Sequence, residues 1–598
     1  MASPIDDALR VADQPETRGS FVHFLLDLLR VDTTVGPDLD RVRANEEEAL
    51  DLISQAVETF LGTWRGLERV PIDPRIEADP YYTPVHYTKT AERPEGLGAA
   101  EAYRGRSNLV LRVPGQGKGT LALNAHIDVV APYIPPRVEG DVVYGRGACD
   151  DKGQCAVMLL ALYLIEHARW REPGAGEGRG LIPPADLLLE FVIDEEPGGN
   201  GSLSLALDRR FAFDALVVLE ATNLAVHPGN RGAVWYRLDL DGSAAPGLDL
   251  VGLAASLVLA LEEEGAALKA ESAHPLFPHR PVQTCHGVLG PWGKHPSAVN
   301  DHVELALFTD GEPDLAKLRA IADRAVADYV AAYGDKTREA DPATGRPKVD
   351  HHYDLDRASG GARLVVHGKA GHMGAILQCD DAITKAAYIV RALEADKGLR
   401  VRRFSVESEA HCRFPIADCR LQIAEAELRA KSEIGNRKSE IGDRESPTLV
   451  LEGGQGFLPT HSLREVTERM RRAVADAAAA YCRQHGVACP PGLARMSFDK
   501  LHNDAFARDP GRPAVRAFVE CVRAAGIEVP EPLRGWDVSC DARVFAREYP
   551  AADIITFGTG RLEHAHSAQE QVRVDDIAAA AKAVARFALT FEPQARDS

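Results

Sequence analysis

Three features that would classify a chain at once are missing from this sequence. No stretch approaches the roughly 18 uncharged apolar residues of a membrane-spanning helix, and the first residues lack the basic and then apolar regions of a secretory signal. The ten cysteines follow neither zinc-finger spacing nor the rhythm of a disulfide framework. These absences favour a cytoplasmic protein with no membrane partner, whose cysteines are reduced and mostly buried.

Positive charge is also scarce. Lys and Arg total 69 against 89 Asp and Glu, which gives a formal net charge of -20. An excess of negative charge argues against nucleic acid or an anionic membrane as a partner. The glycine pairs in GGNG (198–201) and GGQG (453–456) do not complete a G-x-G-x-x-G turn between a strand and a helix. A nucleotide-binding enzyme is therefore only weakly supported.

With 598 residues the chain is too long for one ordinary core, so at least two domains are expected. Apolar strands alternate with helices in the first third of the chain, and this order predicts an α/β fold with a mostly parallel sheet covered on both faces. The strands are expected at 108–115, 120–130, 185–194 and 214–220, with a helix at 154–168. The pattern returns near the end, so residues 1–231 and 490–598 are predicted to form one domain.

Residues 232–489 have a different pattern. Strands and helices follow the order β-α-β-β-α, and the order recurs from Gly361. We interpret this segment as an inserted α+β domain made of two ferredoxin-like halves, at about 232–345 and 350–489.

Ligand-type side chains stand at the ends of several predicted strands. They are His126 and Asp128, Asp150 and Asp151, Glu195 and Glu196, Glu220, and His564 and His566. The carboxyl ends of parallel strands meet at one edge of the sheet, so these residues should converge. A lone His or Glu at a strand end is usually a solvated loop residue or a helix cap, but neighbouring carboxylates repel one another without a cation. The pattern favours a site for two Zn²⁺ ions, with Co²⁺ or Mn²⁺ as alternatives.

These motifs also resemble a known family. In order and spacing, HIDVV, GRGACDDKG, DEEPGGNG, LEATN and HAHSAQE are similar to the signatures of the co-catalytic zinc metallopeptidases and deacylases. This family includes acetylornithine deacetylase, succinyl-diaminopimelate desuccinylase, aminoacylase, carboxypeptidase G and carnosinase-type dipeptidases. The resemblance covers the whole first domain, from LLRVDTT (28–34) to the segment before the last histidine.

The resemblance implies a role for each of these residues. His126 and Glu220 would bind one ion, Glu196 and His566 the other, and Asp150 would bridge the two. Asp128 would hydrogen-bond and orient the His126 imidazole, and the peptide bond from Asp150 to Asp151 would be cis. Glu195 would be the general base that takes a proton from the metal-activated water and passes it to the leaving nitrogen. His564 is expected to be a flanking residue.

The inserted domain would act as a lid. In VHGKAGHMGAI, His372 stands where the family has a histidine, supplied by the partner subunit of a dimer, that stabilises the oxyanion. The matching place in the first half, LDGSAAPGLDL, has no histidine. The resemblance therefore implies that the second half does within one chain what a partner's lid does in a dimer, so a monomer is plausible and a homodimer stays open. A satisfied structural histidine is the alternative.

The substrate is less well defined. Asn300 and Arg413 are candidates for binding the substrate carboxylate, because the family's usual lid residues are replaced here by DDAI (380–383) and HCRFP (411–415). We expect hydrolysis of an amide in a small molecule, either a peptide bond or an N-acyl amino acid. Glu at position 220 resembles the carboxypeptidase and deacylase branch, whereas the lid layout resembles the dipeptidase branch. The alternative is a non-catalytic binding protein that retains the fold.

Overall fold

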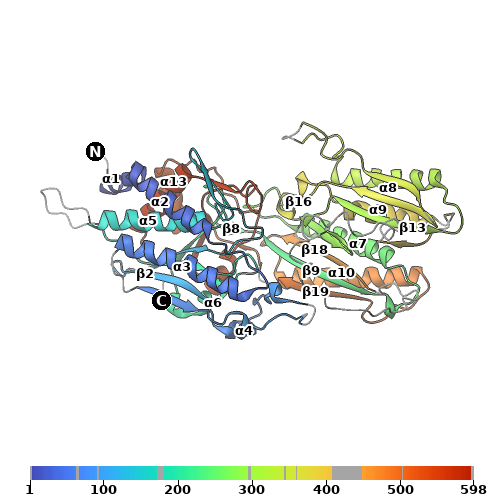
Figure 1. The fold of residues 1–598 in the computed structure, drawn as a ribbon, viewed down its shortest axis with the longest axis horizontal. Helices are drawn as coiled ribbons and strands as arrows, with labels where there is room; N and C mark the ends of the chain where they lie inside the picture. The colour runs from blue at the N-terminus through green and yellow to red at the C-terminus, as the bar shows by residue number, and fades with distance from the viewer. Residues whose placement is uncertain are drawn as a thin grey trace, which may run out of the picture.

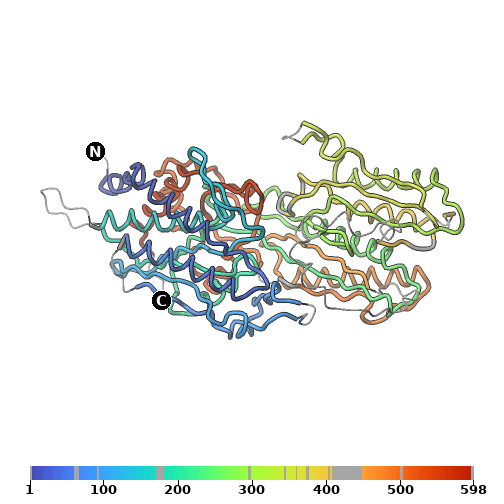
Figure 2. The backbone as a smooth tube through the Cα atoms, viewed as in Figure 1, coloured from blue at the N-terminus to red at the C-terminus, as the bar shows by residue number. Residues whose placement is uncertain are grey.

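The computed structural model describes residues 3–593 apart from 62–65, 91–92, 94, 171–180, 294–295, 297, 342–344, 359, 397, 400, 407–447 and 501–502. The chain forms two lobes side by side (Figures 1 and 2). One lobe has a core drawn from residues 8–226 and 506–591, and the other has a core from 234–493. After the roles that the family resemblance implies, we call the first lobe the catalytic domain and the second lobe the lid.

The catalytic domain is built on a six-stranded sheet in the order β1-β2-β6-β3-β7-β21. Its strands are β1 (Leu67–Pro71), β2 (Ser107–Val113), β3 (Thr120–His126), β6 (Asp186–Val192), β7 (Ala215–Leu219) and β21 (Asp553–Phe557). Strands β6, β3, β7 and β21 pair in parallel, while β1 and β2 form an antiparallel edge. The predicted α/β fold with a mostly parallel sheet is confirmed.

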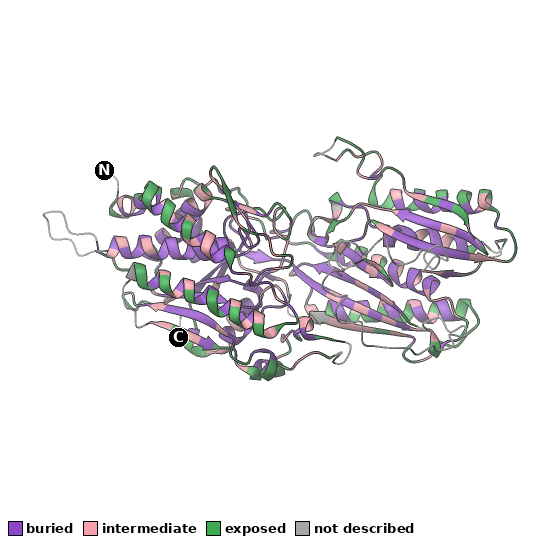
Figure 3. Cartoon of the chain, viewed as in Figure 1, coloured by how far each residue is buried: buried purple, intermediate pink, exposed green. Residues whose placement is uncertain are grey.

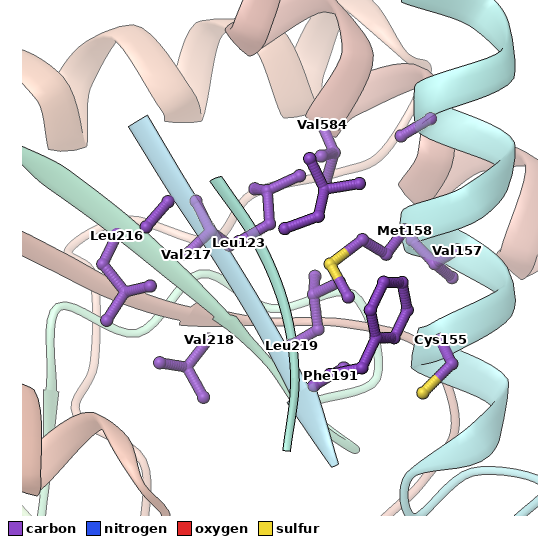
Figure 4. Packing of buried hydrophobic residues seen from close by; sticks show 14 of the residues in the cluster. Leu123, Cys155, Val157, Met158, Phe191, Leu216, Val217, Val218, Leu219 and Val584 are labelled. Carbon is purple, nitrogen blue, oxygen red and sulfur yellow. The ribbon is translucent and has the colours of Figure 1, made fainter. Parts of the chain in front are cut away.

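Helices cover this sheet. They include α2 (Pro15–Arg30), α3 (Leu39–Leu61), α5 (Lys152–Trp170), α6 (Asn200–Leu207), α11 (Pro513–Ala524), α12 (Ala542–Glu548) and α13 (Val574–Thr590). Figure 4 shows Met158 of α5 and Val584 of α13 packed toward Leu123 and Phe191 of the sheet, and all four are fully buried. Each such side chain contributes about 1.5–3 kcal/mol through the hydrophobic effect. The strands are therefore apolar almost to their carboxyl ends.

The lid contains two larger sheets with helices. Figure 3 shows helices of both lobes with buried residues on one side and exposed residues on the other, whereas the central strands of the catalytic domain are buried along almost their whole length. The larger, antiparallel sheet has the order β11-β10-β18-β9-β19. Its elements in chain order are β9 (Gly232–Asp241), α7 (Leu250–Glu271), β10 (Thr284–Leu289), β11 (Trp292–Gly293), β18 (Thr448–Phe457), α10 (Leu463–Gln484) and β19 (Ala494–Lys500). Apart from the short β11, this is the β-α-β-β-α-β order of a ferredoxin-like unit.

The smaller, antiparallel sheet has the order β14-β15-β13-β17. It is formed by β13 (His302–Thr309), α8 (Leu315–Tyr333), β14 (Tyr353–Ala358), β15 (Gly361–His367), α9 (Ala382–Ala395) and β17 (Val401–Ser405). These elements repeat the ferredoxin-like order. We call residues 302–405 the inner unit and the larger sheet with its helices the outer unit.

The predicted boundaries of the two halves, 232–345 and 350–489, are wrong. The inner unit lies between β10 and β18 of the outer unit, so one unit is nested in the other. The first predicted half would separate β13 from its partners β15 and β17, and the end at 489 would exclude β19, which pairs with β9. The recurring element order is local information, whereas the choice of partner strands depends on long-range packing.

No helix in the described parts of the chain is long and apolar enough to cross a membrane.

Candidate active site

The carboxyl edge of the parallel strands gathers the first set of ligand-type side chains. His126 is the last residue of β3, and Glu220 directly follows β7. Their ligand atoms lie within 4.8 Å of one another and of those of Asp150 and Asp151. The His126 Nε2 atom is 3.1 Å from Asp150 Oδ1. His126 and Glu220 are buried, as their positions at the ends of central strands require.

Asp150 also belongs to a second set, which contains Glu196 and His566. The His566 Nε2 atom lies 3.1 Å from Asp150 Oδ2 and 3.0 Å from Glu196 Oε1. The two oxygens of Asp150 thus each face the imidazole of a different ligand set, which is the position that the predicted bridging residue needs. The Asp150–Asp151 peptide bond is cis, as the resemblance implied.

The orientation of His126 differs from the prediction. Its Nδ1 atom lies 2.9 Å from the main-chain oxygen of Asp128, whereas the Asp128 carboxylate is 3.6 Å away and beyond hydrogen-bond range. A carbonyl oxygen only accepts, so Nδ1 donates to it, and Nε2 is the ring nitrogen at which a metal would bind. The carboxylate of Asp128 instead accepts the N–H groups of Glu195, at 3.1 Å, and Glu196, at 3.0 Å. Asp128 therefore holds the loop that carries both glutamates.

The environment of Glu195 suits a proton acceptor. Its side chain is largely buried, and Oε1 lies 3.7 Å from Nη1 of Arg543. Burial, followed by the negative charge of Asp541, raises the pKa of Glu195 to about 8 against the opposing effects of His126 and Arg543. A carboxyl with a pKa near neutrality can both take and return a proton.

The donor set of this centre fits two divalent metal ions. Imidazole and carboxylate ligands suit zinc and its neighbours in the first transition row. Asp151 Oδ1 is buried and has no hydrogen-bond partner among the described residues. Burial, then the neighbouring charge of Asp151, also raises the pKa of Glu220 well above its usual range. Carboxyl groups buried this close together ionise at the same time only when cations balance their charge.

Comparison with known families decides where the chain belongs. The model of peptidase family M20/M25/M40 matches residues 122–590. The chain belongs to this family. M20 enzymes are metal-dependent hydrolases, and the two ligand sets described above are a candidate metal-binding cluster of this chain.

Individual relatives match shorter segments of this M20 chain. A LysW-lysine/LysW-ornithine hydrolase from Sulfurisphaera tokodaii is 35% identical over 92 residues, which is 14% of the chain and 27% of the relative. A probable carboxypeptidase from Aspergillus terreus is 37% identical over 134 residues, which is 21% of the chain and 28% of the relative. The matched segments thus span less than a third of the length of either curated relative.

The fold of the M20 chain is also similar to solved structures. Human carnosine dipeptidase 1 superimposes with a TM-score of 0.51 at 12% identity, over 98% of each chain. This similarity supports the fold, including an inserted lid, and nothing finer.

Sequence reasoning missed Glu570. Its Oε1 atom accepts the N–H groups of Gly147 at 2.9 Å and Asp150 at 3.2 Å, and its other oxygen pairs with Arg146. The pairing of β22 (Gln571–Arg573) with β5 (Val142–Tyr144) brings Glu570 to this loop. Glu570 is the last residue of the motif HAHSAQE, four residues after His566. Its place in this motif is the feature of the sequence that could have indicated its role.

Arg543 was also missed as an individual residue, although its segment was included in the resemblance. It follows Cys540 and Asp541 at the start of α12, and its side chain is 2% exposed. Only the folded chain shows that this guanidinium faces Glu195.

Two of the predicted lid residues, His372 and Asn300, lie in or next to a separate two-stranded sheet, β12-β16. Strand β16 (Gly371–His372) pairs with β12 (Ala298–Val299), and His372 is opposite Ala298. Asn300 directly follows β12 and is buried, and its Nδ2 atom has no hydrogen-bond partner among the described residues. Figure 1 places β16 on the side of the lid toward the catalytic domain. Arg413 lies outside the described residues.

His564 is not in either ligand set found among the described residues. Its main-chain N–H donates to Arg561 and its main-chain oxygen accepts the Ser567 hydroxyl. These bonds shape the turn that presents His566.

Proposed function

We propose that this M20 protein hydrolyses an amide bond in a small substrate, either a dipeptide or C-terminal peptide bond or an N-acyl amino acid. The observation that carries the proposal is the position of Asp150, shared by two ligand sets, with Glu195 held beside them. Glu195 lies next to the metal ligand Glu196 in sequence, and Asp128 accepts both of their N–H groups. The base and one ligand are therefore positioned as a unit.

Two zinc ions are the metals that the donor set supports best, with cobalt or manganese as substitutes. His126, Asp150 and Glu220 would hold one ion, and Asp150, Glu196 and His566 the other. Bound there, the ions would polarise the scissile carbonyl and make a water molecule nucleophilic at neutral pH.

Glu195 would accept the proton of the attacking water and deliver it to the leaving nitrogen. Its burial and the neighbouring Arg543 support this role, because the guanidinium limits where the carboxylate can point. Asp128 would act through the loop rather than through the His126 ring, since its carboxylate binds the N–H groups of that loop.

His372 would stabilise the negative charge that develops on the carbonyl oxygen, and Asn300 would contribute a hydrogen-bond donor to the substrate. The β12–β16 pairing, which puts the two residues near each other in the lid, supports this proposal. The nested units also support a site completed by a single chain, because two ferredoxin-like units are already present. Arg413 remains a candidate for the substrate carboxylate.

The test is a hydrolysis screen of the metal-depleted chain, reconstituted with Zn²⁺, Co²⁺ or Mn²⁺. The panel contains dipeptides and N-acyl amino acids that share their C-terminal residues. We expect metal-dependent release of free amino acid from one class. Metal binding without hydrolysis of any member would favour the alternative, a binding protein that retains the M20 fold.

A further inference from the structure

A third group of convergent metal-type side chains lies in the inner unit of the lid, away from the catalytic centre. It consists of His351, Asp354 and His367, whose ligand atoms lie within 4.8 Å of one another. His351 precedes β14, Asp354 is in β14, and His367 is the last residue of β15. No sequence motif indicates this group, because its two histidines belong to different segments of the chain.

The sheet fixes two of these residues relative to each other. In the β14–β15 pairing Asp354 is opposite Val365, so the side chain of His367, two residues on, shares its face of the sheet. The His367 N–H also donates to the main-chain oxygen of His352 at 2.9 Å, which extends the pairing to the residue next to His351. The three side chains are therefore brought together by backbone hydrogen bonds.

Both imidazoles face one carboxylate. His351 Nε2 is 3.0 Å from Asp354 Oδ1, and His367 Nε2 is 2.8 Å from Asp354 Oδ2. In the catalytic centre, the two corresponding distances from imidazole nitrogens to the oxygens of Asp150 are both 3.1 Å. Ligands at about 2.0–2.1 Å from a tetrahedral zinc ion lie roughly 3.3 Å apart, so small side-chain rotations would suffice.

We propose that His351, Asp354 and His367 form a third metal site, for a divalent transition-metal ion such as Zn²⁺. Two imidazoles with one carboxylate favour such an ion over Ca²⁺ or Mg²⁺, which prefer oxygen ligands. The side chains are 54%, 50% and 29% exposed, so water can complete the coordination. This site is separate from the proposed hydrolytic function and does not depend on it.

The location gives the ion a structural role. His351 ends the long connection that follows α8. His367 ends β15, and the next strand, β16, carries His372. In this connection Lys348 Nζ also bonds to Gln378 Oε1, at 3.0 Å, in the short helix after His372. A bound ion would fasten the connection to β15 and so restrain both sides of the His372 segment.

The test counts zinc ions per chain by elemental analysis, after metal-depleted full-length protein is equilibrated with micromolar Zn²⁺ and passed through a desalting column. We expect three ions for the wild type and two for His351→Ala or His367→Ala. The matched control is His279→Ala, because His279 is also exposed and bonds to a single aspartate, Asp537, at 2.7 Å. The control should keep all three ions.

A second variant separates this proposal from the catalytic one. Asp150→Asn should lose the catalytic pair and retain one ion, and adding His367→Ala should remove that ion. A wild-type chain that binds no more zinc than His367→Ala would overturn the third site, whatever the catalytic centre binds. In that case the two imidazoles and the carboxylate are only a hydrogen-bonded cluster.

Discussion

Asp150 and His566 come from the two separate segments of the chain that form the catalytic domain, yet Asp150 Oδ2 and His566 Nε2 lie 3.1 Å apart. The other oxygen of Asp150 is the same distance from His126 Nε2. Asp150 is thus the only residue common to both ligand sets of the catalytic centre in the described chain.

This sharing predicts that Asp150→Asn loses both catalytic ions, because an amide cannot bridge two cations as a carboxylate does. Glu220→Gln should lose one ion and retain the other. Isothermal titration of metal-depleted protein with Zn²⁺ measures the difference. Equal losses in the two variants would contradict the bridging role of Asp150.

Replacing Glu195 by Gln should leave the ions in place and lower kcat by about 10²–10⁴, the usual contribution of a general base. The KM should change little, because the amide has the size of the carboxyl. Steady-state kinetics and metal analysis of the same preparation test this. Near wild-type turnover in this variant would remove Glu195 from the mechanism.

Glu570→Gln should weaken metal binding and destabilise the fold. Glu570 and Arg146 form a buried ion pair in which each side chain is 1% exposed. Removing one charge of such a pair typically lowers the free energy of unfolding by about 3–5 kcal/mol. Loss of a group that positions a metal-binding loop lowers affinity by about 10–100-fold. Urea denaturation and zinc titration would show the two effects, and a variant unchanged in both would refute the role.

His372→Ala should reduce kcat by about 10²–10³ with a small change in KM, if this histidine stabilises the developing oxyanion. His485→Ala, at the C-terminal end of α10 in the outer unit, serves as the control for a general effect of removing a lid histidine. If kcat falls equally in both variants, or in neither, His372 has no specific role in catalysis.

Glu190 predicts a pH dependence of stability. It is fully buried in β6 and has Asn124, at 3.0 Å, as its hydrogen-bond partner, and burial raises its pKa from 4.5 to about 8. The folded chain holds this proton between those values while the unfolded chain releases it. The resulting stabilisation is full below about pH 4.5 and is lost as the pH rises toward 8.

Glu190→Gln should therefore gain stability relative to the wild type as the pH is raised from 5 to 8. Denaturant unfolding of both chains at each pH measures the gain. A difference between the chains that is constant over this range would show that Glu190 is ionised in the folded state.

The sequence alone determined the α/β fold, the strand ends that carry His126, Glu196 and Glu220, and the inserted lid with its repeated ferredoxin-like order. These are local properties, because the periodicity of hydrophobic residues and the residues that end a strand can be recognised within a short stretch of sequence. Tertiary structure decided the nesting of the lid units, the contact of Asp128 with the Glu195 loop, the placement of Glu570 and Arg543, and the meeting of His351 with His367. Each of these depends on which distant segments pair, and that choice follows from the burial of whole faces rather than from any short stretch of residues.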